Sequence, residues 1–296
     1  MRALILALAL AFAADTPATY RTEIEQYRKH RIEELTAPNG WLAVQGLFWL
    51  HEGANTAGSD PASQIKLPAR TPKKIGVFTL TGTNVTFTAE PSAGVIAGGQ
   101  PIETFTFDPR KGEQSAVTAA GVTLFVIRRA EKTGLRMLDP DSDARKSFHG
   151  LQYFPLSPAY RVKAKFVPYD KMKSVPVPNV LGQIVPMDSP GRVEFTIGGK
   201  PYSLEPVYET SKHEDLFFIF KDLTSRTETY EAGRFLHTPL PVNGYVDVDF
   251  NHAYNPPCAF TDFATCPLPV KENQLQTRIP AGELRWKHTS AREPVR

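Results

Sequence analysis

Residues 193–208 read VEFTIGGKPYSLEPVY, two runs of β-branched and aromatic residues joined by Gly198 and Gly199. A two-glycine loop tolerates the positive φ angles of a primed turn, so this stretch predicts a β-hairpin. A second hairpin is predicted at 77–88, VFTLTGTNVTFT, where Gly82 begins the turn. Further runs of strand length and composition occur at residues 41–50, 122–129, 160–169, 216–220 and 245–250.

These strands follow one helix and show no strand–helix alternation, which is typical of antiparallel β-structure. We therefore expect a mainly β chain, an antiparallel β-sandwich or barrel-like fold. A single β-rich domain is expected over residues 41–296, although the proline-rich stretch 173–190 could separate two halves.

Residues 15–40 predict the one helix, which is amphipathic and ends at the Ala-Pro-Asn-Gly sequence 37–40. Its apolar stripe at helical spacing consists of Tyr20, Ile24, Tyr27 and Leu35. The basic run 28–31 predicts a solvated face. The alternative is that one of its arginines turns inward to a site.

Residues 1–14 predict a secretory signal peptide, because Arg2 precedes an apolar run that ends in the small-residue pattern Ala-Phe-Ala at 11–13. The apolar run is about half of the roughly 20 residues that a membrane-spanning helix needs. No later segment approaches that length. We therefore expect a periplasmic or secreted protein without a transmembrane segment.

The composition is that of an ordinary globular protein, with 41% hydrophobic and 22% charged residues. The net charge of +3 is spread along the chain, so nucleic acid is not an expected partner. The nucleophile elbow, the P-loop, the dinucleotide-binding glycine pattern and the paired histidines of a zinc-protease helix do not occur. We expect no cofactor and no metal.

Polar residues concentrate in the last third of the chain. Candidate ligand-binding residues are Tyr230, Arg234, Asn251, Tyr254, Asn255 and Asn273, and candidate catalytic carboxylates are Glu228 and Asp249. Carboxylate, amide, phenol and guanidinium groups in one neighbourhood are what a polar-ligand pocket needs. The alternative is that these residues only satisfy the backbone of proline-rich loops.

Four stretches together resemble the bacterial family known as domain of unknown function 1684. They are residues 40–60, 148–162, 227–236 and 249–283, the last reading DFNHAYNPPCAFTDFATCPLPVKENQLQTRIPAGE. The resemblance spans nearly the whole mature chain and implies one functional unit from the helix to the C-terminus. The family has no settled reaction.

Matched residue by residue, the family motifs single out Trp41, Gly46, Tyr230, Gly233, Arg234, Asp249, Asn251, Tyr254, Asn255, Cys258, Cys266 and Asn273. This chain departs from the expected pattern at Arg226, His252 and Val270. His252 is therefore a poor candidate for a chemistry shared across the family.

Cys258 and Cys266 are the two cysteines of the chain. In an exported protein a disulfide is the favoured interpretation. Metal binding would need two more ligands, such as His252 or His237. A catalytic Cys258 thiolate, activated by His252 and oriented by Asp249, also has the required residue types.

A cluster of charged residues follows the apolar strand 122–129, with Arg136, Asp139 and Arg145 close behind Arg128 and Arg129. A salt-bridged turn is the simplest interpretation. Anion binding is the alternative, since guanidinium groups bind oxyanions in a bidentate manner.

Three functions follow from these residues. The favoured one is binding of a small polar ligand, a sugar or a carboxylate, because ligand-binding residue types are present and an activated nucleophile is not. The second is a hydrolase that uses Glu228 or Asp249 as general acid or base. The third is a structural β-domain of the cell envelope without a site.

Overall fold

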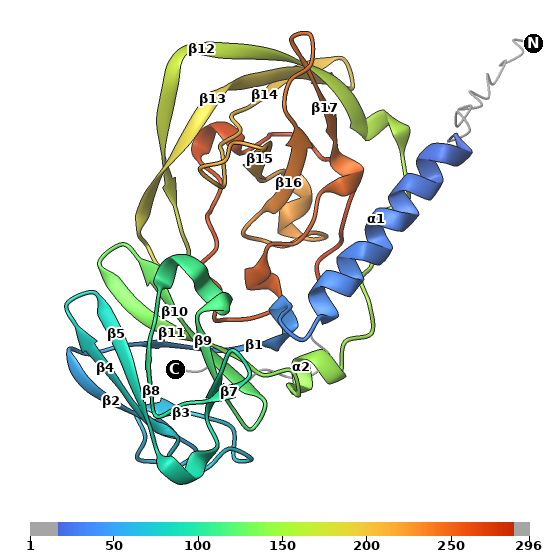
Figure 1. Cartoon of the computed structure of the whole chain (residues 1–296). Coiled ribbons are helices and arrows are strands. Elements are labelled where there is room, and N and C mark those ends of the chain that lie inside the picture. The colour runs from blue at the N-terminus through green and yellow to red at the C-terminus, as the bar shows by residue number, and fades with distance from the viewer. Residues whose placement is uncertain (1–16, 287–296) are drawn as a thin grey trace, which may run out of the picture.

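A computed structural model describes residues 17–286 of the chain. The predicted signal peptide, residues 1–14, lies outside the described residues. Figure 1 shows two β-rich halves that follow one another in the chain, with helix α1 (Ala18–Thr36) along the C-terminal half. The prediction of a mainly β, antiparallel fold with one N-terminal helix is confirmed. The helix is shorter than the expected 15–40, and it ends just before Ala37 and Pro38.

The N-terminal half is a sandwich of two sheets (Figure 1). The six-stranded sheet has the order β1 (Val44–Trp49), β11 (Lys132–Leu138), β10 (Val122–Arg129), β9 (Ala116–Ala119), β6 (Ile96–Ala97) and β7 (Gln100–Pro101). The five-stranded sheet has the order β3 (Ile65–Lys66), β2 (Gly53–Gly58), β4 (Gly76–Thr81), β5 (Asn84–Ala89) and β8 (Thr104–Thr106). Its β2–β3 pairing is parallel. Alternate residues of both sheets, including Phe78, Phe87, Leu124 and Leu135, form one hydrophobic core.

The C-terminal half has a four-stranded sheet and a two-stranded sheet. The first has the order β14 (Lys200–Leu204), β13 (Ile184–Ile197), β12 (Arg161–Pro178) and β17 (Tyr245–Asp249), and the second pairs β15 (Asp215–Phe220) with β16 (Arg234–Pro239). A separate core that includes Phe218, Phe220 and Phe250 fills this half. Phe263 joins a smaller cluster with Phe125 and Ile127 of the N-terminal half. The expectation of one domain over 41–296 stays a prediction.

Short helical turns connect these strands. They are α2 (Asp143–Lys146) and the 3-10 turns η1 (Trp41–Ala43), η2 (Pro91–Ala93), η3 (Pro109–Gln114), η4 (Pro158–Tyr160), η5 (Leu223–Arg226), η6 (Phe250–His252), η7 (Pro257–Ala259) and η8 (Lys271–Asn273). Within residues 17–286, no helix is both long enough and apolar enough to cross a membrane.

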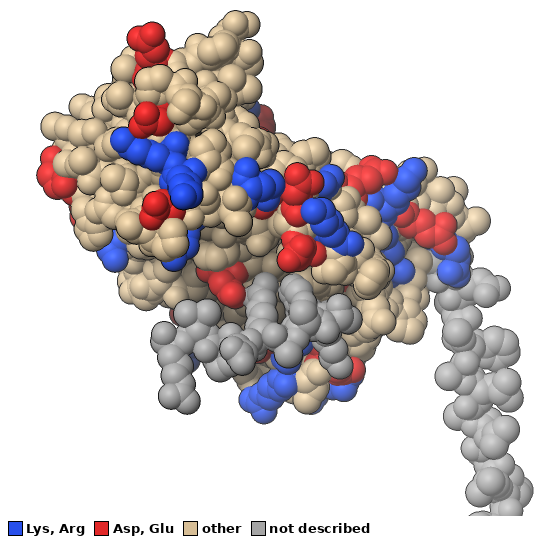
Figure 2. All heavy atoms as spheres, turned by 90° about the horizontal axis from the view of Figure 1, so that it is seen from below, with Lys and Arg blue, Asp and Glu red and all other residues tan. Residues whose placement is uncertain are grey.

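Both expected hairpins form. Gly82 and Thr83 connect β4 to β5, and Gly198 and Gly199, with φ of 57° and 76°, connect β13 to β14. The stretch 173–190 is a hairpin as well, because its two ends pair from Lys173↔Ser189 to Pro178↔Ile184. Figure 2 shows that acidic and basic side chains are interspersed on the face seen from below, in keeping with the small net charge.

Arg234 lies in the interior of the C-terminal half, where its side chain is 0% exposed. Its guanidinium donates hydrogen bonds to Asp222 Oδ1 at 3.0 Å, to Ile279 O at 3.0 Å and to Ala281 O. Asp222 also accepts a hydrogen bond from Ile279 N at 2.6 Å. The pair therefore fixes the chain at 279–281 against β16.

Cys258 and Cys266 lie at disulfide distance, with their Cα atoms 6.2 Å apart. Cys266 is buried in an apolar cluster with Val177, Ile219 and Phe235. Cys258 N also donates a hydrogen bond to Cys266 Sγ at 3.1 Å. The cysteine pair thus closes a short loop against the sheet, as the sequence predicts.

Replacing Arg234 should destabilise the fold. Arg234→Met leaves Asp222 buried without its cation, so we expect the free energy of unfolding to fall by about 3–5 kcal/mol in urea denaturation. Arg226→Met, at an exposed arginine of η5, is the control and should change it by less than about 0.5 kcal/mol. Similar values for the two variants would contradict the anchoring role.

Opening the cysteine loop should also cost stability. The double variant Cys258→Ser, Cys266→Ser is expected to lose about 2–3 kcal/mol, the chain-entropy value for so short a loop. The mass of the unreduced, denatured protein should rise by two hydrogens on treatment with a reducing agent. Two free thiols before reduction would contradict the pairing.

Candidate functional site

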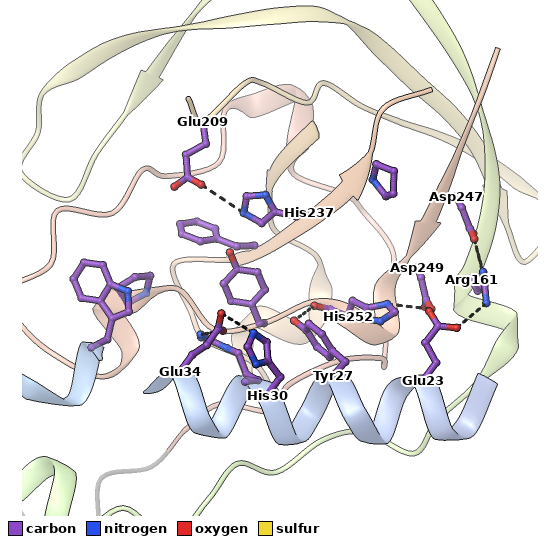
Figure 3. A pocket seen from close by; sticks show the side chains of 16 residues that line it. Glu23, Tyr27, His30, Glu34, Arg161, Glu209, His237, Asp247, Asp249 and His252 are labelled. Carbon is purple, nitrogen blue, oxygen red and sulfur yellow. Dashed lines mark hydrogen bonds and ion pairs between the residues drawn. The ribbon is translucent and has the colours of Figure 1, made fainter. Parts of the chain in front are cut away.

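A cavity of about 770 Å³ lies between α1 and the C-terminal half. Figure 3 shows Glu23, Tyr27, His30 and Glu34 extending from α1 toward His237, Glu209 and Asp247 on the other side. The remaining lining residues are Arg31, Trp41, Arg161, Phe235, Pro239, Asp249, His252, Tyr254 and Pro257. The cavity thus has one wall from the helix, and the others come from η1, β12, β16, β17, the loop before β15 and the loops that follow β17.

Asp249, at the end of β17, is held by several donors. Tyr20 donates to its Oδ2 at 2.7 Å, Asn251 donates to its Oδ1 through the backbone at 2.9 Å and the side chain at 2.8 Å, and His252 Nδ1 lies 3.2 Å from Oδ2. Burial alone would raise the pKa of Asp249, but the hydrogen bonds from His252, Tyr20 and Asn251 outweigh it and lower that pKa. Asp249 is therefore a charged carboxylate at neutral pH that orients the His252 ring.

A second polar group ties α1 to the last loop. Arg31 Nε donates to Glu283 Oε1 at 3.1 Å and Arg31 Nη2 donates to Asn255 O at 3.0 Å, while Asn255 N donates to Glu283 Oε2 at 2.8 Å. Burial raises the pKa of Glu283, although Arg31 and the Asn255 hydrogen bonds oppose that shift. Burial disfavours the charged form of Arg31, but the Glu283 charge outweighs it and raises the pKa of Arg31.

Gly282 allows Glu283 to enter this interior position. Its φ is 80°, and an added Cβ would lie 2.3 Å from Ala253 O. A larger residue would thus push the last loop away from the loop that follows β17.

Three imidazoles line the cavity, those of His30, His237 and His252, and His30 Nε2 lies 3.2 Å from Glu34 Oε1. His237 Nδ1 lies 2.7 Å from Asp215 Oδ2 and its Nε2 lies 3.7 Å from Glu209 Oε2, while its ring stacks on Phe217 at a centroid distance of 4.5 Å. The His252 ring packs edge-on against the Tyr27 ring, with the two ring centroids 4.5 Å apart. The rings of His237 and His252 are thus oriented by acids and aromatic neighbours.

The lining carries more carboxylates than guanidinium groups. Its carboxylates are Glu23, Glu34, Glu209, Asp247 and Asp249, and its guanidiniums are Arg31 and Arg161. Arg161 binds Asp247 at 2.6 Å, and Arg31 is occupied by Glu283 behind the wall. Aromatic rings supply the rest of the surface, with the Arg31 guanidinium 4.6 Å from the Tyr254 ring centroid.

The structure divides the residues predicted from the sequence into three groups. Asp249 and Tyr254 line the cavity. Asn251 and Asn255 are buried behind it, where they hold Asp249 and the Arg31–Glu283 pair. Arg234 lies elsewhere in the interior, as described above.

Three other candidates also lie away from the cavity lining. Glu228 is bound by Arg278 at 3.0 Å, and Tyr230 donates to Cys258 O at 3.2 Å. Asn273 accepts from Glu205 N at 2.8 Å and donates to Ile219 O at 3.0 Å. Each of these three side chains thus binds a neighbouring part of the protein and does not line the cavity.

The sequence reading missed most of the helix wall and His237. Of the basic run 28–31, Arg31 turns inward and is 7% exposed, as the alternative expectation stated. The sequence contains a signal for this inward position, because Arg31 lies at helical spacing between Tyr27 and Leu35 and so shares their face of the helix. Within residues 17–286, no group of three or more His, Cys, Asp or Glu side chains is arranged to hold a metal ion.

Comparison with known proteins identifies the C-terminal half. The model of the family described as protein of unknown function (DUF1684) matches residues 146–284, which include the whole of β12–β17 and the loops around the cavity. No curated protein matches. The solution NMR structure of the uncharacterized protein from gene locus rrnAC0354 of Haloarcula marismortui is 31% identical, over 47% of this chain and 78% of that one, with a TM-score of 0.40. The chain therefore belongs to the DUF1684 family of proteins of unknown function.

Proposed function

We propose that this protein binds a small polyhydroxylated ligand of the sugar class in the cavity beneath α1. The observation that carries the proposal is the lining, which combines the rings of Trp41, Phe235 and Tyr254 with carboxylates and imidazoles. Sugar hydroxyls both donate and accept hydrogen bonds, and the C–H face of a sugar packs on an aromatic ring. The volume of about 770 Å³ is in the usual range of small-molecule sites, roughly 300–1,000 Å³.

Charge favours a sugar over a carboxylate, the other ligand class that the sequence suggests. Glu34 and Glu209 face the cavity together with Asp249, whose pKa is lowered by the donors around it. The guanidinium of Arg31 is occupied by Glu283. Arg161, the other guanidinium of the lining, is paired with Asp247. An anionic ligand would therefore meet like charges and two guanidiniums that are already paired, whereas neutral hydroxyl groups can donate to the carboxylates.

Export is part of the same proposal. It is supported by the signal-peptide pattern of residues 1–14 and by the Cys258–Cys266 pair, because disulfides persist in oxidising compartments. A sugar-binding protein of the periplasm or the medium would meet its ligand there.

Hydrolysis is the second candidate, and the His252–Asp249 contact favours it. Asp249 suits orientation of the His252 ring better than proton donation, because its pKa is lowered. His252 would act as a general base that takes a proton from water as the water attacks the carbon of the bond to be cleaved, and the protonated ring would then give that proton to the leaving oxygen. Glu228, the other carboxylate proposed for catalysis, is not among the cavity-lining residues.

Two pairs of glutamates provide a test of ligand binding. Glu34→Ala and Glu209→Ala each remove an acceptor from the cavity, so we expect each to weaken sugar binding about tenfold, equivalent to about 1.4 kcal/mol. Glu33→Ala and Glu214→Ala are matched controls at exposed positions outside the lining and should leave the affinity unchanged. The measurement is isothermal titration with a panel of mono- and disaccharides, with succinate and citrate as carboxylate probes.

The outcomes separate the alternatives. Binding of succinate but of no sugar would contradict the proposed ligand class, and equal effects of Glu34→Ala and Glu33→Ala would contradict the site. Cleavage of nitrophenyl glycosides that is lost in His252→Gln, with sugar binding retained, would instead favour the hydrolase.

A further inference from the structure

A second cavity, of about 580 Å³, lies in the N-terminal half beside β10, at the edge left free where β9 ends. Four arginines line it, namely Arg110, Arg128, Arg129 and Arg136, and Asp108 is the carboxylate in its lining. Asp108 is already bound by Arg110 through two hydrogen bonds of 2.9 Å. The other three guanidiniums have no carboxylate partner among the described residues.

Arg136 is the most unusual of them, because it is 7% exposed and its Nε and Nη2 atoms have no hydrogen-bond acceptor within residues 17–286. The Trp41 ring lies 5.1 Å from its guanidinium carbon. Burial, with a smaller contribution from the Arg129 charge, lowers the pKa of Arg136 to about 10. The side chain is thus still charged at neutral pH, and buried charges are ordinarily paired.

Asp139, the acid that follows Arg136 in the sequence, is bound by another arginine. Asp139 accepts from Arg70 Nη1 at 2.9 Å, and Arg145 donates to the carbonyls of Thr36 and Pro140 at 2.6 and 2.8 Å. The salt bridge expected in this region therefore forms through Arg70. It leaves Arg136 without a counterion.

The position of Arg136 follows from the alternation of β11. Leu135 and Met137 point into the N-terminal core, so Arg136 lies on the opposite face, which packs toward the C-terminal half. Arg129 lies on the same sheet and donates to Thr265 Oγ1 at 2.8 Å, in the loop closed by the cysteines. The arginine cavity thus adjoins the junction between the halves.

We propose that the arginine cavity binds a small oxyanion, a phosphate, sulfate or carboxylate group, through Arg129 and Arg136. A planar guanidinium presents parallel N–H donors to two oxygens of such a group, and a bound anion would compensate charges that the protein leaves unpaired. This site is separate from the cavity beneath α1. It takes an anion, whereas the α1 cavity is proposed to take a neutral sugar. It therefore stands whether or not the protein binds a sugar.

Thermal unfolding at constant ionic strength tests the site, with sodium phosphate, sodium sulfate or sodium citrate replacing sodium chloride. We expect at least one of them to raise the Tm of the wild type in a saturable manner, as for a ligand that binds the folded state alone. Arg136→Met removes a buried unpaired charge, so without oxyanion its Tm should equal or exceed that of the wild type. It should also lose the oxyanion-dependent increase.

Arg129→Gln is the second variant and should weaken the affinity for the best oxyanion at least tenfold in isothermal titration. Arg226→Met and Glu34→Ala, which alter an exposed loop and the α1 cavity, should bind that oxyanion like the wild type. The relative strength of the three anions identifies the preferred group. A wild type without a saturable response, or a response retained in Arg136→Met, would overturn the proposal.

Discussion

The buried ion pair between Arg31 and Glu283 determines where the helix lies, and the cavity depends on that placement. The two residues are 252 positions apart, and their side chains are 8% and 0% exposed. Such a pair is stable only when its remaining donors and acceptors are satisfied, and Asn255 contributes to this on both sides of the pair. Tyr20, about three turns earlier in α1, makes the corresponding contact with Asp249. Without these contacts the cavity would lose one wall.

The family motifs therefore combine two kinds of residue. Arg234, Asn273 and the cysteine pair organise loops in the interior. Asp249 and Tyr254 face the cavity, and Asn251 holds Asp249 in place. The arginine cavity adjoins the same cysteine loop through the hydrogen bond from Arg129 to Thr265.

Much of the fold could be predicted from the sequence, because alternation and glycine turns are local signals. The stretch 193–208 forms β13, its two-glycine turn and β14 as expected. Long-range pairing has no comparable local signal. The sequence shows Arg31 in a basic run and Glu283 in a turn, and only the fold brings them together. The sequence predicts Arg234 at a ligand because it lies among carboxylate, amide and phenol groups, but its partner is the interior Asp222. The candidate site could thus be located approximately, through Asp249 and Tyr254, while its helix wall could not.

Hydrogen–deuterium exchange of the variant Glu283→Gln tests the central claim most directly. If the Arg31–Glu283 pair fixes α1, loss of the carboxylate charge should accelerate amide exchange in residues 18–36 at least a hundredfold, corresponding to about 3 kcal/mol. Exchange in β15 and β16 should stay the same, as should that of α1 in the control Glu228→Gln. Unchanged protection of α1 in Glu283→Gln would contradict the account, because the helix would then be held without the pair.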